Sequence, residues 1–253
     1  MSNVYHLSLT SADIQGAKHA ILPGDPARAA SIAHQINPNS KEIAHKREFR
    51  TFLGRLGDTN ILVTSTGIGG PSTAIVIDEL AKLGVRTFIR IGTTGAIQED
   101  IDIGDVIITN GSVRLDGTST HYAPIEYPAV ASHHVTQALI QGAQQTKVKA
   151  HVGITASCDT FYPGQERYDS YSGYVRKSFQ GMTEEWRKLH VLNYEMESAT
   201  LLTVCSAMGL HSGCVTGVVV NRTRSEAVSL DNLEKGETHA ITVGIKGLEM
   251  LLS

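Results

Sequence analysis

Candidate ligand-binding residues fall in four short segments of this 253-residue chain. The first, residues 23–28, reads PGDPAR and places Gly24 between an apolar run and a helix-forming stretch. Glycine lets the backbone approach a ligand closely, and the free N–H groups of a helix N-terminus attract anions. Arg28 in the first turn would add a bidentate donor. The segment is a candidate anion site, although a strand-to-helix turn also requires glycine for structural reasons alone.

The second segment, residues 89–95, reads IRIGTTG and contains an arginine inside a run that otherwise resembles a buried strand. An unpaired buried guanidinium is costly, so Arg90 requires an anionic partner. That partner is either a carboxylate of this protein or a bound ligand, and the segment alone favours neither. The hydroxyls of Thr93 and Thr94 lie beside two glycines and suit a phosphate or sugar oxygen.

The third segment, residues 161–168, reads FYPGQERY. In an extended chain Gln165 and Arg167 would point the same way, because they are two residues apart. An amide beside a fixed cationic fork fits a planar group with alternating carbonyls and N–H groups, on which Phe161 or Tyr162 would stack. The structural alternative is a solvated loop with ordinary turn residues.

The fourth segment, residues 193–198, reads NYEMES and places Glu195 and Glu197 on either side of Met196. We expect it at a strand-to-helix junction. A carboxylate accepts two hydrogen bonds and therefore suits vicinal hydroxyls. Glutamates in a first helical turn are also favoured by the helix dipole alone, so both interpretations stay open.

Composition and charge exclude several classes of function. The apolar content of 41% and a net charge of −3 exclude disorder, and 22 Lys+Arg against 25 Asp+Glu disfavour a nucleic-acid binder. The histidines show no metal-binding spacing, and the chain has no phosphate-binding P-loop and no dinucleotide fingerprint. We therefore expect a small-molecule partner.

The cysteines and the N-terminal residues predict a cytoplasmic protein. Three cysteines without CxxC spacing indicate neither a disulfide framework nor a zinc site, and we expect Cys158 to be structural. The first twenty residues lack the apolar core of a signal peptide, and no run of eighteen apolar residues occurs.

The elements that would position these segments alternate between β-rich and helical runs. Strands are expected near residues 20–22, 61–66, 85–91, 105–109, 151–157, 191–194 and 214–220. Helices are expected at 27–35, from 67–72 to Gly84, at 132–145, 195–208 and 233–252. Asp25 is placed to cap the first helix. This alternation predicts an α/β fold in one domain, residues 1–253, with a mostly parallel sheet that binds ligands at the carboxyl ends of its strands.

The four segments, together with residues 65–72 (STGIGGPS), resemble in sequence and order the bacterial uridine phosphorylases of the nucleoside phosphorylase family. The likeness extends from His6 to the last helix. The glycine and arginine turns are shared with the wider family, whereas 161–167 is specific to the uridine-acting branch. The resemblance implies a three-layer α/β/α sandwich around a mixed, mostly parallel twisted sheet.

The resemblance also implies a reaction and a role for each matching residue. The reaction is reversible phosphorolysis, in which uridine and inorganic phosphate give uracil and ribose 1-phosphate without a further cofactor. The residues implied to drive it are Arg167, Gln165, Glu197 and Arg90. Phosphate would be bound by Gly24, Arg28, Arg90 and Thr93, with Arg47 of a neighbouring subunit. Ribose would be bound by Thr93, Met196 and Glu197, with His6 of that neighbour. Uracil would be held by Gln165 and Arg167, lined or supported by Phe161, Tyr194, Glu195, Val220 and Arg222.

The resemblance further implies an assembly and a cation site. The relatives form hexamers built from dimers, and some hold a monovalent cation, potassium, at the dimer interface. The matching residues here are Glu48, Ile68 and Ser72. One departure is Lys46, which stands where the relatives carry histidine and alters the electrostatics near Arg47.

Cleavage of an N-glycosidic bond builds positive charge on the sugar and negative charge on the leaving base. Preorganised groups can stabilise both charges without a metal or a covalent intermediate. Phosphate held under the sugar by arginines would be both nucleophile and counter-charge. Uracil leaves as a delocalised anion, which a cation beside an amide can stabilise.

Three alternatives remain open from the sequence. A purine nucleoside phosphorylase is disfavoured by the 161–167 loop, and a nucleosidase that uses water is disfavoured by the three arginines. A non-catalytic nucleoside-binding protein would not need those arginines to converge on an anion. Tolerance of thymidine or deoxyuridine is not determined by these residues.

Overall fold

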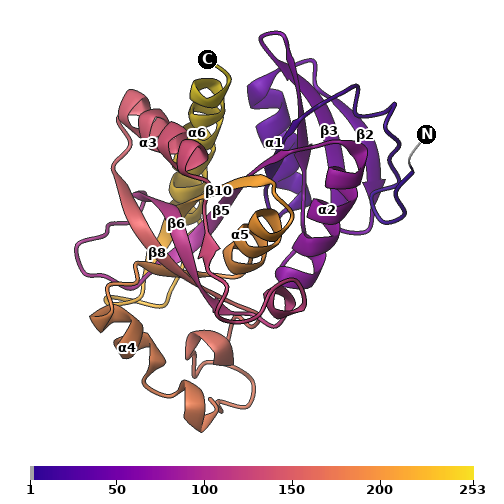
Figure 1. The fold of residues 1–253 in the computed structure, drawn as a ribbon. Coiled ribbons are helices and arrows are strands. Elements are labelled where there is room, and N and C mark those ends of the chain that lie inside the picture. The colour runs from indigo at the N-terminus through magenta and orange to yellow at the C-terminus, as the bar shows by residue number, and fades with distance from the viewer. Residues whose placement is uncertain (1–2) are drawn as a thin grey trace.

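The computed structural model describes residues 3–253, which fold around one ten-stranded mixed sheet with helices on both faces (Figure 1). The strands are β1 His19–Leu22, β2 Lys41–Lys46, β3 Phe49–Leu56, β4 Thr59–Thr64, β5 Thr87–Ala96, β6 Val106–Leu115, β7 Ala129–Val130, β8 Ala150–Cys158, β9 Asn193–Glu195 and β10 His211–Asn221. The helices are α1 Pro26–Ile36, α2 Gly70–Leu83, α3 His133–Thr146, α4 Met182–Lys188, α5 Ser198–Ala207 and α6 Leu230–Leu252. The α/β fold expected from the sequence is confirmed.

One part of the sheet is an open row of strands, and the other part closes into a ring. Its order is β10-β6-β8-β9-β5-β1-β4-β3-β2, and β10 also pairs with β5. Strands β5, β10, β6, β8 and β9 therefore form a closed ring of hydrogen-bonded pairs. The pairs β1–β4, β1–β5, β5–β10, β6–β8 and β8–β9 are parallel, whereas β2–β3, β3–β4, β5–β9, β6–β7 and β6–β10 are antiparallel. The sheet is therefore mixed, and its two longest ladders, β5–β10 and β6–β8, are parallel, as the resemblance implies.

Two apolar cores cover the two faces of the sheet. Helices α1, α3 and α6 bury Ile32, Leu139 and Val243 on one face, and α2 and α5 bury Leu80 and Leu201 on the other. Burial of each such side chain contributes roughly 1.5–3 kcal/mol. The layers match the sandwich implied by the resemblance.

Helix α6 lies directly against β10, where two glycines meet. A Cβ atom on Gly217 of β10 would lie 1.9 Å from the carbonyl oxygen of Gly236 on α6. No side chain fits between the two backbones, so the two glycines allow α6 to pack closely on β10. Residues 222–229 connect β10 to α6.

Most expected elements are present with shifted ends. Asp25 caps α1 as expected, since its carboxylate accepts a hydrogen bond from the Ala27 N–H at 2.8 Å. Strand β5 continues to Ala96, so Thr93 and Thr94 lie in the strand and not in a turn. Helix α5 begins at Ser198 and not at Glu195, which belongs to β9.

Strands β2 and β3 and helix α4 are not anticipated by the sequence reading. The β2 sequence KEIAHK is mostly polar and half-exposed, because β2 is an edge strand that packs only Ile43 and Ala44 against the core. Among residues 3–253, no helix combines the length and apolar character needed to cross a membrane.

Candidate active site

A cavity of about 530 Å³ lies at the carboxyl ends of β1, β5, β9 and β10. Its volume is within the range of small-molecule sites. All four candidate segments reach it, so residues far apart in the chain converge as expected. The predicted residues that line it are Gly24, Arg28, Ile68, Arg90, Thr93, Phe161, Gln165, Arg167, Tyr194, Glu195, Met196, Glu197 and Val220.

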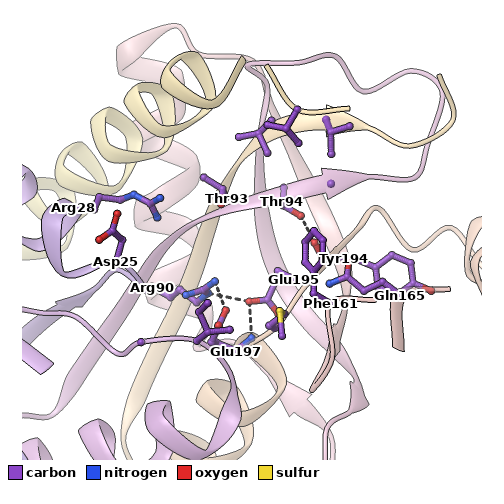
Figure 2. Close-up of a pocket in the computed structure, with 18 of the residues that line it drawn as sticks. Asp25, Arg28, Arg90, Thr93, Thr94, Phe161, Gln165, Tyr194, Glu195 and Glu197 are labelled. Carbon is purple, nitrogen blue, oxygen red and sulfur yellow. Dashed lines mark hydrogen bonds and ion pairs between the residues drawn. The ribbon is translucent and has the colours of Figure 1, made fainter. Parts of the chain in front are cut away.

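The two ends of the cavity carry different polar groups, a cation at one end and an amide beside an aromatic ring at the other. Figure 2 shows Arg28 near α1 at one end and Gln165 with Phe161 at the other. Arg90 and Glu197 lie between them. The arrangement can hold an elongated ligand with an anion at one end and a planar polar group at the other. We call the end at Arg28 the anion end and the end at Gln165 and Phe161 the planar end.

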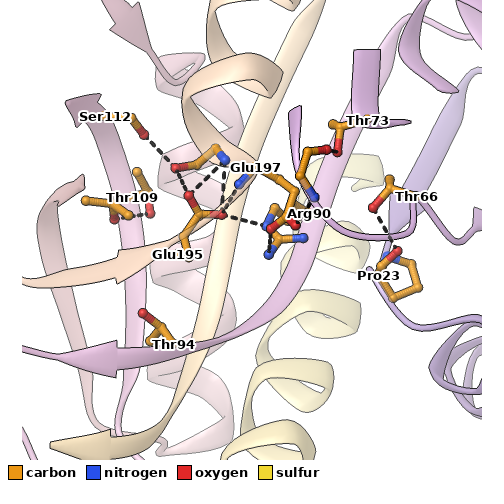
Figure 3. A network of polar contacts seen from close by, with 12 residues as sticks. Pro23, Thr66, Thr73, Arg90, Thr94, Thr109, Ser112, Glu195 and Glu197 are labelled. Atoms are coloured by element: carbon orange, nitrogen blue, oxygen red, sulfur yellow. Dashed lines mark hydrogen bonds and ion pairs between the residues drawn. The ribbon is translucent and has the colours of Figure 1, made fainter. Parts of the chain in front are cut away.

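Arg90 is the most constrained cation of the site. It is buried, its Nε donates to Glu195 Oε2 at 2.9 Å, and its Nη2 forms an ion pair with Glu197 (Figure 3). Burial alone would lower the pKa of Arg90, but the Glu197 and Glu195 carboxylates outweigh it and raise that pKa. Arg90 therefore stays charged. The carboxylate partner that the sequence left open is present.

One donor of Arg90 remains unused. Its Nη1 is buried and has no hydrogen-bond partner among residues 3–253. A buried guanidinium N–H without an acceptor is costly, and a bound anion would satisfy it. The carboxylate interpretation of Arg90 is confirmed, and the unpartnered Nη1 is compatible with the second interpretation, contact with an anionic ligand, which stays a prediction.

Glu195 organises the turn between β9 and α5. Its carboxylate accepts from the backbone N–H of Glu197 at 3.0 Å and from the backbone N–H and hydroxyl of Ser198 at 2.9 and 2.6 Å. With Arg90 as a fourth donor, its oxygens are already satisfied. The structure therefore favours a supporting role for Glu195 over direct contact with a base.

Glu197 is the N-cap residue of α5 and is fully enclosed. Its Oε1 accepts the Gly69 N–H at 2.7 Å, and its Oε2 pairs with Arg90. Burial raises the pKa of Glu197, opposed by Arg90 and reinforced by Glu195. With Met196 beside it on the cavity wall, Glu197 lies between the anion end and the planar end.

For uridine, the substrate that the resemblance implies, replacing Glu197 by glutamine is expected to lower kcat/KM by about 10- to 100-fold, the value of a hydrogen bond to a charged group. The loss should be smaller for deoxyuridine if the carboxylate accepts the 2′ hydroxyl. Steady-state kinetics with both nucleosides measure the difference. Glu184→Gln, at an exposed position in α4, is the control. Equal losses for both nucleosides would contradict contact with that hydroxyl.

The planar end is built from a turn and not from an extended chain. Residues Pro163–Gln165 form a short 3₁₀ turn, and Glu166 follows with a φ of 54°. The premise that Gln165 and Arg167 share a face of an extended segment is therefore wrong. Both side chains are nevertheless buried in the wall of the same cavity, because the turn reverses the chain between them.

Aromatic rings hold the arginines at this end. The Arg167 guanidinium lies 4.4 Å from the Phe161 ring centre, and the Arg222 guanidinium lies 5.2 Å from that of Tyr194. The pKa of Arg167 is lowered mainly by burial and, to a smaller extent, by the positive charge of the nearby Arg222. Arg222 does not line the cavity and supports it from behind.

The anion end combines a helix N-terminus with Arg28. A Cβ atom on Gly24 would lie 3.3 Å from the Gly67 carbonyl oxygen, so the two glycine turns are in close approach. Arg28 forms an ion pair with Glu237 of α6, and its Nε is buried without a partner in the described part of the chain. Thr93 lines the cavity between Arg28 and Thr94 (Figure 2).

Comparison with known proteins decides the family. The family model described as "Phosphorylase superfamily" matches residues 18–245. This chain belongs to the phosphorylase superfamily. It is 53% identical over 253 residues to a uridine phosphorylase of Haemophilus influenzae, covering 100% of both chains. It is 53% identical over 251 residues to a uridine phosphorylase of Escherichia coli, covering 99% of each. It is 45% identical over 247 residues to a uridine phosphorylase of Thermococcus kodakarensis, covering 98% of this chain and 86% of that one.

Two residues expected from the resemblance lie outside this phosphorylase chain's own cavity. His6 donates its backbone N–H to Glu79 and holds the same carboxylate through Nδ1 at 2.7 Å. Arg47 is exposed in the β2–β3 turn with a φ of 56°. Their role in a neighbouring subunit stays a prediction. The departure at Lys46 has a structural use, since its Nζ donates to the Tyr5 carbonyl at 2.7 Å.

The expected cation residues gather on one surface of the phosphorylase chain. The Ser72 hydroxyl donates to the Ile68 carbonyl at 3.1 Å, and the Glu48 side chain packs against Gly67. Carboxylate, carbonyl and hydroxyl oxygens suit a hard cation. No cluster of three or more His, Cys, Asp or Glu side chains that could hold a metal occurs within residues 3–253.

The cysteines take no part in the site chemistry. Cys158, Cys205 and Cys214 are free and buried, and burial raises the pKa of each thiol to about 12. At neutral pH they stay protonated, which agrees with the structural role expected for Cys158.

Residues that the sequence reading missed are carboxylates and small apolar groups. Asp25, Val219 and Val228 also line the cavity, while Glu226 and Glu237 pair with site arginines. No spacing rule connects Glu226 with Arg167, because the pair arises from tertiary packing. The sequence held no signal for Glu226, because the burial of Arg167, which calls for a carboxylate partner, is visible only in the structure.

Proposed function

We propose that this chain is a uridine phosphorylase, a pentosyltransferase that converts uridine and inorganic phosphate reversibly to uracil and ribose 1-phosphate. Relatives at 45–53% identity over nearly the whole chain carry that name. The observation that carries the proposal is Arg90, which lines the cavity of about 530 Å³ and whose buried Nη1 has no partner within residues 3–253.

Phosphate is the co-substrate that fits the anion end. Arg28, the Arg90 Nη1 and Thr93 supply donors, and the Gly24 turn lets the backbone approach. Holding phosphate beneath the sugar makes attack effectively unimolecular and removes much of its entropic cost. In the reaction a phosphate oxygen forms a bond to C1′ while the C1′–N1 bond breaks, and its electron pair leaves with uracil.

The planar end suits the leaving base. Gln165 can donate to one uracil carbonyl and accept from N3–H, and Arg167 can stabilise the negative charge that develops on the ring. Glu197 and Met196 are the proposed ribose contacts. The Glu197 carboxylate accepts hydroxyl hydrogen bonds while Arg90 keeps it oriented.

We also propose that the working enzyme is a homohexamer, a trimer of dimers, with His6 and Arg47 completing a neighbour's site. The position of both residues outside their own cavity supports this. Glu48, Ile68 and Ser72 are the proposed ligands of a potassium ion at the dimer interface, and the reaction itself requires no further cofactor.

Release of uracil from uridine, measured with and without phosphate, tests the function. We expect release only with phosphate present. Substantial release without phosphate would indicate a nucleosidase. Faster cleavage of inosine or adenosine than of uridine would indicate a purine phosphorylase, and binding without turnover would indicate a non-catalytic nucleoside-binding protein.

A further inference from the structure

Two guanidinium groups lie together at the planar end of the cavity. The side chains of Arg167 and Arg222 are only 5% and 4% exposed, so water screens them weakly. Two cations in a poorly hydrated site repel each other and move apart unless an anion holds them. The geometry of the base-binding residues therefore depends on a carboxylate.

That carboxylate is Glu226, in the segment between β10 and α6. One of its oxygens pairs with Nη1 of Arg167, and the other accepts from Nε of Arg222 at 2.7 Å. Each oxygen thus serves one arginine. Glu226 does not line the cavity and is 45% exposed, whereas Arg167 does line it. The carboxylate therefore holds Arg167 from outside the ligand space.

Arg222 extends the link to the second base-binding residue. Its Nη2 donates to the backbone carbonyl of Gln165 at 2.8 Å, and its plane lies over Tyr194. Glu226 consequently connects Arg167 with the backbone of Gln165 through one intermediate residue. Arg167 itself lines the cavity, and its buried Nε has no partner within residues 3–253.

We propose that Glu226 is a positioning residue for the leaving base. It neutralises the repulsion between Arg167 and Arg222 and fixes the orientation of both, so that Arg167 and Gln165 present their free groups to uracil. The proposal rests on the function proposed above. No contact between Glu226 and the substrate is involved.

Two opposing effects decide the sign of the expected change. Loss of the Glu226 charge would by itself favour the departing uracil anion, but this carboxylate is half-exposed and its field is screened by water and salt. A displacement of a catalytic group by about 1 Å costs about 100-fold. The loss of orientation is therefore expected to exceed the electrostatic gain.

The test compares Glu226→Ala, Glu226→Gln and Glu226→Asp with the wild type. Kinetic constants for uridine and phosphate are measured separately. We expect Glu226→Ala to lower kcat/KM for uridine by about 10- to 100-fold while KM for phosphate stays within twofold. Glu226→Asp keeps the charge and should recover a large part of the activity, and the isosteric Glu226→Gln should lie between them. Asp231→Asn, exposed in the first turn of α6, is the matched charge control and should leave kinetics unchanged.

The outcomes separate this proposal from the proposed function. A wild type that releases no uracil from uridine and phosphate would overturn the function itself. With an active wild type, a Glu226→Ala variant within twofold for uridine would overturn the positioning role. An equal rise of KM for uridine and phosphate would also overturn it, since the effect would then not be confined to the base. If Glu226→Ala does not fold, the same criteria apply to Glu226→Gln.

Discussion

Replacement of Arg167 by alanine should reduce kcat for uridine phosphorolysis by about 10²–10³, the usual cost of removing one preorganised transition-state donor. Arg167 is buried in the cavity wall and its guanidinium is stacked on Phe161, so alanine would leave both a missing charge and a void. KM for phosphate should change little, because Arg28 lies at the opposite end of the cavity and Arg90 lies between the two ends (Figure 2). Steady-state assays with each substrate varied in turn measure both quantities.

Arg176→Ala supplies the control for Arg167. Arg176 belongs to the same long connection between β8 and α4 but is exposed and outside the cavity. Its removal should leave kcat unchanged. If Arg167→Ala retains activity within a few-fold of the wild type, the base leaves without help from this arginine and the assigned role is wrong.

Replacement of Arg90 by methionine should have the largest effect on stability. The variant leaves Glu195 and Glu197 buried without their shared cation, and breaking a buried ion pair from one side costs about 3–5 kcal/mol. The free energy of unfolding, measured by urea denaturation, should fall by that amount. Phosphorolysis should also be lost with it. Arg50→Met is the control, because the Arg50–Glu42 pair is partly exposed and contributes about 1 kcal/mol or less.

The pH dependence of the Arg90→Met variant follows from its unpaired carboxylates. Burial already raises the pKa of Glu197, and loss of Arg90 raises it further. A carboxyl whose folded pKa exceeds its unfolded pKa loses stability as pH rises between the two values. The deficit relative to the wild type should therefore be smaller at pH 5 than at pH 8. A deficit that grows toward low pH would show that the buried charges are not its cause.

The site could be predicted from the sequence because its residues have side chains suited to ligand binding and lie in or next to strands whose carboxyl ends meet in the fold. Gly24 and Glu197 each follow a strand, and Arg90 lies within β5 beside Leu22, the last residue of β1, so the parallel strands bring these residues together. The two interpretations of Arg90 could not be separated from the sequence, since its carboxylate partners lie over one hundred positions away.

The remaining features depend on tertiary packing and are therefore absent from local patterns. Gln165 and Arg167 converge through a 3₁₀ turn that no alternation rule predicts. The hairpin of β2 and β3 was missed because its edge strand is charged and half-exposed. Glu237 reaches Arg28 from α6, and Glu226 reaches Arg167 from the segment after β10, so each carboxylate lies far along the chain from that arginine.

The ring of β5, β10, β6, β8 and β9 also determines how this site can move. Close to the cavity, β9 is hydrogen-bonded to β5 and β8, and β10 to β5 and β6. Each of these two strands is hydrogen-bonded on both sides. Local unfolding of either strand therefore requires the hydrogen bonds to two neighbouring strands to break together. Any movement of the site that accompanies ligand entry or product escape is therefore expected in the connecting segments. Backbone amides of Thr93, Tyr194 and Val218 should exchange with solvent far more slowly than those of residues 222–229.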